Sequence, residues 1–195
     1  MSSLFRTRIR ELGLAGLLVL AAVDSWSTAT VAEIPEPEGY REGAYRAPVP
    51  RTLAGTTALD TAGLVMLLAR EPVVLLDVMP TARRPPGRPA DRLWLGPRRV
   101  HLPGSVWLPN VGLGELPPST SAWLAARLAE LTRGDHDVPL VVYCERDCWM
   151  SWNAAKRIRQ ELGYRRVYWY PDGIQGWEEA GLPLVPAIPE AEPGE

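Results

Sequence analysis

Two cysteines lie close together in the segment YCERDCWMSW at positions 143–152, and they are the only cysteines in the chain. Cys144 and Cys148 are separated by three residues, a spacing that allows three kinds of chemistry. The pair can act in thiol redox or sulfur transfer. It can form an inert disulfide, although so short a loop stabilises by less than the roughly 3 kcal/mol of a 15-residue loop. It can also bind a metal, and copper(I) is the ion that thiolates favour.

A metal site at these thiols would need further ligands, and His101 and His136 are the only histidines of the chain. His101 lies in the HLPG segment, which we expect to pack near the sheet, and His136 lies in the polar turn GDHD. We therefore predict no metal at the cysteines and no bound cofactor, while a copper chaperone remains an alternative.

The cysteine pair is expected to lie between a strand and a helix. The apolar run at 139–144 predicts a buried parallel strand that ends on Cys144, and residues 151–163 predict a helix that begins near Met150 or Ser151. Free amides and the positive end of a helix lower the pKa of a nearby thiol. We expect Cys144 to be the attacking or sulfur-bearing thiolate and Cys148 to be the resolving thiol. The candidate substrate-binding residues are their neighbours, Glu145, Arg146, Asp147, Trp149, Met150 and Ser151.

Further strands and helices alternate along the chain. Strands are predicted at 72–78, 105–109 and 166–170, and helices over residues 119–134 and 174–181 and after a capping Asp60. This alternation predicts an α/β fold with a central, mostly parallel sheet flanked by helices. Asp77, at the end of a strand, is expected to fix a loop by accepting hydrogen bonds.

The first 32 residues are typical of a signal peptide. Three arginines precede an apolar segment, Leu12–Val23, and small residues before Glu33 allow cleavage after Ala32. Twelve apolar residues fall short of the roughly 20 that span a bilayer, although an uncleaved anchor is the alternative. We predict a periplasmic protein that does not interact with the membrane after cleavage, in a compartment where cysteine pairs are often oxidised.

The remaining boundaries follow from composition. Residues 33–54 form a proline-rich lead-in, which we expect to drape on the domain through Tyr40 and Tyr45. We assign residues 55–185 to the domain itself and predict that residues 186–195 form a disordered tail. The segment 79–104, with six prolines and six arginines, is either a basic-rimmed lid or a solvated insertion. Trp149 could line a binding surface or pack inside, whereas Trp152, Trp169 and Trp177 are expected to pack inside.

Several segments of the chain resemble the rhodanese superfamily. This resemblance implies a three-layer α/β domain over residues 55–185, with Cys144 where those proteins carry a persulfide in a cradle of backbone amides. In that family an arginine often follows five residues later, where this chain has Trp149. The matching segments are LLDV (75–78), HLPGSVWLP (101–109), PLVVYC (139–144) and VYWYPDGIQGWEEAGLPL (167–184).

The segments CERDCWMSWNAAKR and YWYPDGIQGW are most similar to exported rhodanese-like proteins named for a two-cysteine-tryptophan motif and associated with catabolism dependent on pyrroloquinoline quinone (PQQ). Their short name suggests two residues between the cysteines, whereas this chain has three. The resemblance implies an association with PQQ-dependent catabolism, and with the cysteine pair it leads us to predict a persulfide or thiol–disulfide carrier for PQQ-linked alcohol oxidation. Its partner would be a PQQ-dependent alcohol dehydrogenase or its cytochrome. A non-catalytic accessory module for the same partners is the alternative.

Two further expectations follow from charge. A net charge of −2 gives no reason to expect a nucleic acid as partner. Because a flat indole cannot bind an oxyanion as a guanidinium does, Trp149 predicts weak or absent thiosulfate sulfurtransferase activity, unless Arg146 replaces the missing arginine.

Overall fold

A computed structural model of the protein describes residues 33–82, 86–87 and 96–193. A five-stranded sheet lies at the centre, in the order β1-β6-β5-β2-β4, and every pair of neighbouring strands is parallel. Its strands are β1 (Thr57–Ala58), β2 (Val74–Asp77), β4 (Ser105–Trp107), β5 (Leu140–Tyr143) and β6 (Val167–Tyr170). A separate antiparallel pair joins β3 (Val100–His101) to β7 (Val185–Pro186). The predicted signal peptide at 1–32 lies outside the described residues.

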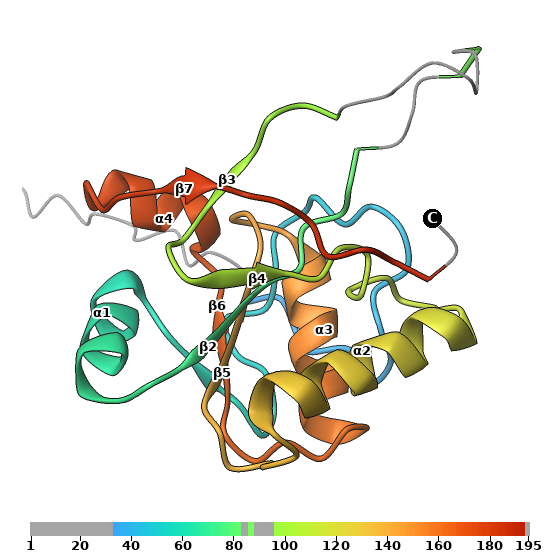
Figure 1. Ribbon diagram of the computed structural model, residues 1–195, viewed down its shortest axis with the longest axis horizontal. Helices are drawn as coiled ribbons and strands as arrows, with labels where there is room; N and C mark the ends of the chain where they lie inside the picture. The colour runs from blue at the N-terminus through green and yellow to red at the C-terminus, as the bar shows by residue number, and fades with distance from the viewer. Residues whose placement is uncertain (1–32, 83–85, 88–95, 194–195) are drawn as a thin grey trace, which may run out of the picture. The chain divides into compact units, whose positions relative to one another are not determined.

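Helices cover both faces of the sheet, which gives three layers (Figure 1). The helices are α1 (Thr61–Arg70), α2 (Pro118–Thr132), α3 (Trp149–Gln160) and α4 (Gly173–Glu179). Alternate residues of β5 point to opposite faces: Val142 packs with α2 and α3, and Val141 packs with α1 and α4. The predicted α/β fold with a mostly parallel sheet and flanking helices is confirmed.

Local sequence explains how the helices begin and end. Asp60 caps α1, and its carboxylate accepts a hydrogen bond from the Gly63 amide at 2.7 Å, as predicted. The helix predicted from 119 begins one residue earlier, at Pro118, because proline suits the first helical position. It ends in two left-handed residues, Arg133 and Gly134.

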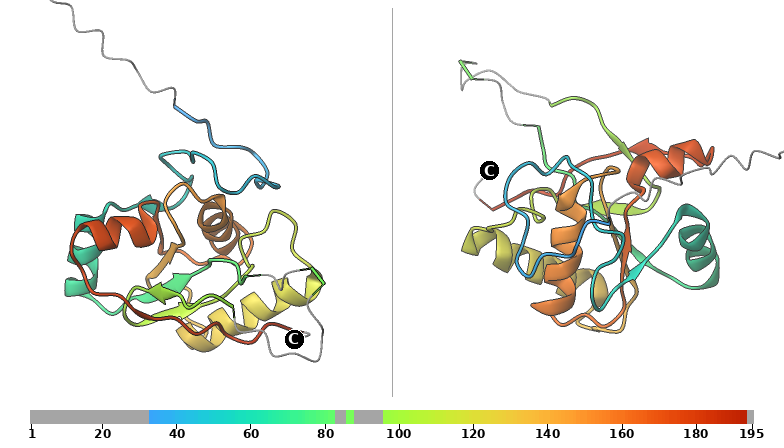
Figure 2. Two further views of the ribbon diagram at one scale, coloured as in Figure 1. Left: turned by 90° about the horizontal axis from the view of Figure 1, so that it is seen from above. Right: turned by 180° about the vertical axis from the view of Figure 1, so that it is seen from behind.

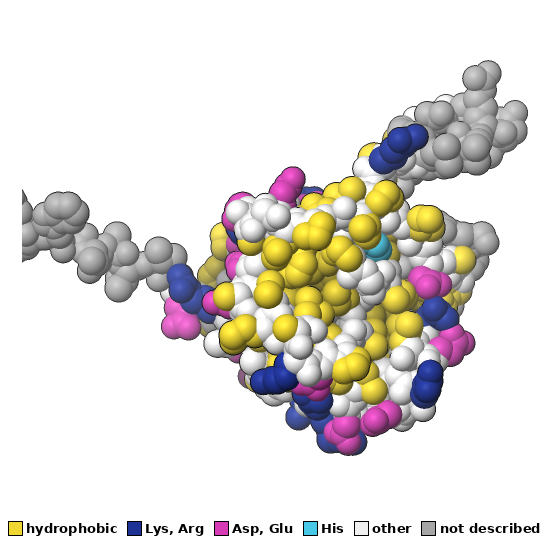
Figure 3. All heavy atoms as spheres, turned by 60° about the vertical axis from the view of Figure 1, so that its left-hand side comes forward, with side chains coloured by type: hydrophobic (Ala, Val, Ile, Leu, Met, Phe, Trp, Pro, Cys, Tyr) yellow, Lys and Arg dark blue, Asp and Glu magenta, His cyan; other side chains and the backbone are white. Residues whose placement is uncertain are grey.

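Hydrophobic side chains gather on the side of the molecule that carries α1 and α4 (Figure 3). Most of the core residues behind this surface are fully buried, but Val65 and Met66 of α1 are exposed. Among the described residues no helix is both long and apolar enough to cross a membrane.

Helix α3 is buried on nearly every side, although half of its residues are polar. Its apolar side, including Trp152 and Ile158, packs on the sheet. Its other side is covered by the lead-in segment (residues 33–54), which crosses the helix in Figure 2. Here the Lys156 ammonium donates to the Pro37 and Gly39 carbonyls at 2.9 and 3.0 Å.

Further hydrogen bonds hold the lead-in segment in place. The Asn153 side chain exchanges two hydrogen bonds with the Arg41 backbone, at 3.0 and 2.9 Å. Tyr40 donates to Glu161, and the Tyr45 hydroxyl accepts from the Gly114 amide at 3.0 Å. The prediction that this segment drapes on the domain through its two tyrosines is confirmed.

Part of the segment 186–195, where we expected a disordered tail, pairs with the domain within the described residues 186–193. Beyond β7, Pro189 pairs with Trp107, and the Glu190 amide donates to the Trp107 carbonyl at 3.0 Å. Glu190 also forms an ion pair with Arg127 at 3.0 Å. The sequence PAIPEAEPGE has no periodic apolar pattern, so no strand was predicted there. Backbone hydrogen bonds to the end of β4 can form without such a pattern.

Candidate active site

The cysteine loop (residues 144–148) lies at the carboxyl edge of the sheet, as predicted. Strand β5 ends at Tyr143, and α3 begins at Trp149. Cys148 is the N-cap of α3, with extended backbone angles. Asp147 is left-handed, with φ of 53°, which lets the chain turn into the helix within so few residues.

Both thiols are free and buried. Cys144 is fully buried, and Cys148 is 4% exposed. The Cys144 sulfur lies 3.6 Å from the carbonyl oxygen of Cys148, so the two residues are in contact across the loop. The structure thus describes a reduced pair.

The two sulfurs have opposite pKa shifts. Burial raises the pKa of the Cys144 thiol well above its usual range, and the neighbouring Cys148 raises it further. The pKa of Cys148 is lowered to about 7, first by a hydrogen bond from Cys144, and also by the Met150 amide and the charge of Arg46. The amide at the start of a helix is an expected donor to a thiolate.

These observations favour Cys148 as the thiolate, which is the opposite of the expected roles. The sequence showed which loop carries both thiols, but it did not show that Cys144 lies beneath Cys148. Desolvation of the deeper sulfur outweighs the donors that surround it, the Ser151 hydroxyl and amide.

Cys148 faces a cavity of about 270 Å³. The lead-in segment forms one wall of this cavity, and the loops that follow β2 and β4 form the others. Its lining residues are Tyr45, Arg46, Met79, Pro80, Thr81, Asn110, Leu113, Cys148 and Met150. Of our predicted site residues, only Cys148 and Met150 lie in this wall.

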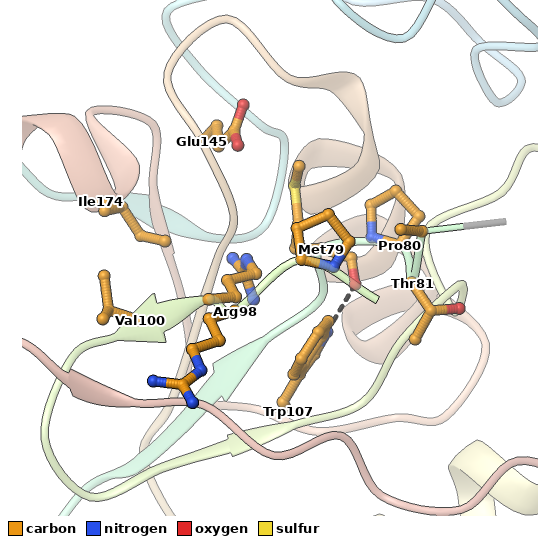
Figure 4. Close-up of a pocket in the computed structure, with 11 residues that line it drawn as sticks. Met79, Pro80, Thr81, Arg98, Val100, Trp107, Glu145 and Ile174 are labelled. Atoms are coloured by element: carbon orange, nitrogen blue, oxygen red, sulfur yellow. Dashed lines mark hydrogen bonds between the residues drawn. The ribbon is translucent and has the colours of Figure 1, made fainter. Parts of the chain in front are cut away.

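A second, larger cavity of about 560 Å³ lies beyond Met79, Pro80 and Thr81, which line both cavities. Figure 4 shows Trp107 beneath Met79, with its Nε1 donating to the Met79 carbonyl at 2.6 Å, and Glu145 on the cysteine loop. Glu145 therefore lines the neighbouring cavity and not the cavity that Cys148 faces.

The remaining predicted site residues hold the loop in place. Arg146 forms two hydrogen bonds to Glu179 of α4, at 2.8 and 2.6 Å, and lies on the surface. This contact holds the side chain against α4, and the substrate-binding role of Arg146 stays a prediction. The Asp147 carbonyl accepts from the Ala47 amide at 3.0 Å, which binds the loop to the lead-in segment.

Trp149 and Ser151 are also part of this framework. The Trp149 indole is 4% exposed, donates from Nε1 to the Pro48 carbonyl at 3.1 Å and packs edge-on against Trp152. Of the two alternatives for Trp149, the structure therefore favours packing. The Ser151 hydroxyl donates to the Cys148 carbonyl at 3.2 Å and accepts from Trp169 at 3.1 Å.

The lead-in segment supplies site residues that the sequence analysis missed. Arg46 pairs as an isolated antiparallel bridge with Cys148, and its guanidinium forms an ion pair with Glu145. The Tyr45 carbonyl accepts from the Trp149 amide at 2.8 Å. The only sequence signal was a pair of tyrosines in a proline-rich stretch, which indicated contact with the domain but not with the cysteines.

Asp77 has the structural role that we predicted. It is fully buried, accepts from the Met79 amide at 3.1 Å and forms an ion pair with Arg99. Arg99 also stacks over Trp107, 4.7 Å from the ring centroid. The ends of segment 79–104 are thereby fixed to the sheet, whereas residues 83–85 and 88–95, on which the choice between lid and insertion depends, lie outside the described residues.

No group of three or more possible metal ligands occurs within residues 33–82, 86–87 and 96–193. His136 stacks on Tyr164, 4.5 Å between ring centroids. His101 lies 3.7 Å from Asp77. The described part of the chain thus brings neither histidine into a cluster with the thiols.

Comparison with solved structures gives several matches at low sequence identity. A thiosulfate sulfurtransferase from Pseudomonas aeruginosa is 22% identical with a TM-score of 0.44, and the match covers 69% of this chain and 21% of that one. A polysulfide-sulfur transferase homodimer from Wolinella succinogenes is 21% identical with a TM-score of 0.41, over 73% of this chain and 85% of that one. This chain therefore spans about a fifth of the Pseudomonas protein.

A 3-mercaptopyruvate sulfurtransferase from Leishmania major is 14% identical with a TM-score of 0.43, over 75% of this chain and 40% of that one. Comparison with curated protein sequences gives no match. The model of the rhodanese-like domain matches residues 61–180, from the start of α1 to the end of α4. By this match, which includes the cysteine loop and all four helices, the chain belongs to the rhodanese-like domain family.

Proposed function

We propose that this protein is an exported thiol protein that exchanges disulfides, or carries sulfane sulfur, on the pair Cys148 and Cys144. One observation carries the proposal: two reduced thiols touch at the N-terminus of α3, and only the thiol that faces a cavity has a lowered pKa. A thiolate at about pH 7 beside a protonated second thiol is the arrangement that disulfide exchange requires.

The reaction would begin at Cys148. Its thiolate attacks a sulfur of the donor, forms a mixed disulfide or a persulfide, and releases the remainder of the donor as a thiolate or anion. The Cys148 sulfur then carries no charge, so its contribution to the raised pKa of Cys144 is lost. Cys144 would therefore become a better nucleophile only after the first step, when it is needed to resolve the intermediate.

The site offers little to a small dianion such as thiosulfate. The Trp149 amide already donates to the Tyr45 carbonyl, and Arg146 is engaged with Glu179. Arg46 is the charged group that lines the cavity of Cys148, and it is paired with Glu145. These contacts support the proposal that thiosulfate sulfurtransferase activity is weak or absent.

The cellular setting is part of the same proposal. The basic and apolar segments within residues 1–32 support export to the periplasm, and the two-cysteine-tryptophan motif supports an association with PQQ-dependent alcohol oxidation. The partner that exchanges sulfur or electrons with Cys148 would then be a PQQ-dependent alcohol dehydrogenase or its cytochrome.

Mass spectrometry of the exported protein under non-reducing conditions tests this function. We expect a chain that begins near Glu33 and carries either a Cys144–Cys148 disulfide or additional sulfur on Cys148. The serine variants of each cysteine assign the modification. A full-length chain that carries two unmodified thiols after exposure to disulfides and sulfane-sulfur donors would contradict both export and the chemistry.

Growth on an alcohol that requires the quinoprotein pathway separates this function from an accessory module. The double replacement of Cys144 and Cys148 by serine should abolish growth if the thiols react. A module that only binds its partner would keep its function in that variant. Loss of growth in Trp149→Ala alone would not identify a binding surface, because the buried indole supports the lead-in segment.

A further inference from the structure

The cavity in front of Cys148 is lined mainly by apolar side chains. Met79, Pro80, Leu113 and Met150 form most of its wall around the sulfur. Its volume of about 270 Å³ is slightly below the roughly 300–1,000 Å³ of typical small-molecule pockets. A cavity of this size accommodates one small ring or a short alkyl group, and it is too small for a folded protein segment.

The polar groups of the same cavity already have partners. The Tyr45 hydroxyl accepts from Gly114, and the Asn110 amide donates to Thr81 at 3.3 Å and to Glu192 at 2.7 Å. The Asn110 amide and the Arg46 guanidinium would have to leave their existing partners to bind an anion, so the neutral O–H groups of Tyr45 and Thr81 are the donors that remain in this wall.

The one cation of the cavity is also balanced. Arg46 forms an ion pair with Glu145, and its side chain is 65% exposed to solvent. Its charge is thus both neutralised and screened, so it provides little net attraction for a dianion. Burying an uncompensated anionic group against Met79, Leu113 and Met150 would be unfavourable.

We propose that this cavity binds the organic group of a neutral, low-molecular-weight disulfide, which makes such a compound the substrate of Cys148. The inference rests on the proposed function and names its substrate class. The Cys148 thiolate attacks the sulfur R–S of R–S–S–R, forms Cys148–S–S–R and releases RS⁻. Cys144 then gives its proton to the released RS⁻ and attacks the Cys148 sulfur, which releases the second RS⁻. The substrate is reduced to two thiols, and the protein is oxidised to the Cys144–Cys148 disulfide.

Two aromatic disulfides that differ in charge test this specificity. The neutral 4,4′-dithiodipyridine and the dianionic 5,5′-dithiobis(2-nitrobenzoate) both release a strongly absorbing product, in the near ultraviolet and in the visible respectively, so the reaction of the reduced protein can be followed by stopped-flow absorbance. Dividing each rate constant by that for glutathione with the same reagent removes the difference in intrinsic reactivity. We expect a normalised preference of about tenfold or more for the neutral disulfide.

Variants that fill the cavity test its role directly. Leu113→Trp should lower the rate with 4,4′-dithiodipyridine by about tenfold, while the rate with the much smaller S-methyl methanethiosulfonate should hardly change. Thr81→Trp, in a partly exposed loop, provides a second variant in case the first fails to fold. Val100→Trp is the matched control, because Val100 lines the neighbouring cavity and is 42% exposed.

Three outcomes separate the cavity from the function. A neutral preference that is lost in Leu113→Trp or Thr81→Trp, but kept in Val100→Trp, supports the cavity as the substrate site. Equal normalised rates for the two aromatic disulfides, unchanged by the filling variants, overturn the substrate class and leave the thiol function intact. Absence of any reaction at Cys148, including with S-methyl methanethiosulfonate, contradicts both.

Discussion

The two ends of the cysteine loop differ in what they contact. At the Cys144 end the loop is bound to α4: the Cys144 carbonyl accepts from Ile174 at 3.1 Å, and the Arg146 amide donates to Gln175 at 2.9 Å. At the Cys148 end it is bound to the lead-in segment, through the Tyr45 carbonyl and the Ala47 amide. The first end lies entirely within the family domain, whereas the second depends on a segment outside the matched residues 61–180.

This difference contributes to the opposite pKa shifts of two identical side chains four positions apart. The Cys144 sulfur is sealed between the sheet and α3, so desolvation dominates. The pKa of Cys148 is lowered first by the hydrogen bond from Cys144, and then by a helix amide and by Arg46 of the lead-in segment, at a sulfur that faces a cavity. A chain segment that adds no strand to the main sheet thereby helps to decide which thiol is reactive.

Replacement of Cys148 by serine should have the largest effect. Reaction with disulfides and sulfane-sulfur donors should disappear, because the remaining Cys144 is buried and its pKa is raised. Cys144→Ser should instead react once and accumulate the mixed disulfide on Cys148. Intact-mass spectrometry distinguishes these results, and accumulation in the Cys148 variant would reverse the assignment.

Loosening the lead-in segment should have the next largest effect. Lys156 is 7% exposed and donates to carbonyls of this segment, and hydrogen bonds from charged groups contribute about 1.5–3 kcal/mol. We expect Lys156→Met to lower the free energy of unfolding by about 2 kcal/mol in urea denaturation. It should also raise the pKa of Cys148 slightly, because Arg46, one of the smaller causes of the lowered pKa, is less well held.

Gln160→Met provides the control for this variant, since Gln160 is exposed on the last turn of the same helix. It should leave both the unfolding free energy and the pKa of Cys148 unchanged. If Lys156→Met behaves like this control, the lead-in segment is not held as the contacts indicate.

Removal of the Cys144 thiol should have a moderate effect on the rate at Cys148. In Cys144→Ala the pKa of Cys148 should rise from about 7 toward 9.0, because its strongest stabilising hydrogen bond is lost. At pH 7 the thiolate fraction would fall by about 50-fold, but the more basic thiolate is about eightfold more nucleophilic, so the rate should fall by about sixfold. Iodoacetamide kinetics between pH 5 and 10 measure the midpoint, and an unchanged midpoint would exclude this hydrogen bond as the cause.

The smallest effects are expected for two arginines near the cysteines: Arg46 of the lead-in segment and Arg146 of the cysteine loop. Arg46→Ala should raise the pKa of Cys148 slightly, because Arg46 contributes less than the Cys144 hydrogen bond and the Met150 amide. Arg146→Ala should leave that pKa unchanged, because Arg146 is bound to Glu179 on the surface. Solvent screens the exposed pair of Arg146 with Glu179, so Arg146→Ala should hardly change stability. The same iodoacetamide titration tests both variants, and a larger shift in Arg146→Ala would show that this side chain faces the thiols.

Local patterns were sufficient to predict the main elements of the fold. Continuous apolar runs predicted β2 and β5, and Asp60 predicted the start of α1, because these features depend on neighbouring residues alone. The short strands β1, β3 and β7 were not predicted, since two-residue strands leave no periodic pattern. The position of the cysteine loop followed from the order of its strand and helix.

The detailed geometry of the site could not be predicted in the same way. Which thiol lies deeper depends on the left-handed Asp147 and on the packing of α3, neither of which is visible in the spacing of the cysteines. The contacts of Arg46 join positions about a hundred residues apart, in a segment without periodicity. The burial of Lys156 and Arg157 was equally hidden, because a polar helix face normally predicts solvent.

The order in which the two thiols are alkylated tests the account most directly. Arg146 lies between the cysteines, so trypsin places them on different peptides and each can be quantified by mass spectrometry. In the reduced, folded protein, limited iodoacetamide should label Cys148 first, with a rate that rises through about pH 7, while Cys144 stays unlabelled until the protein is unfolded. Faster labelling of Cys144 at neutral pH would contradict the assignment of Cys148 as the reactive thiol.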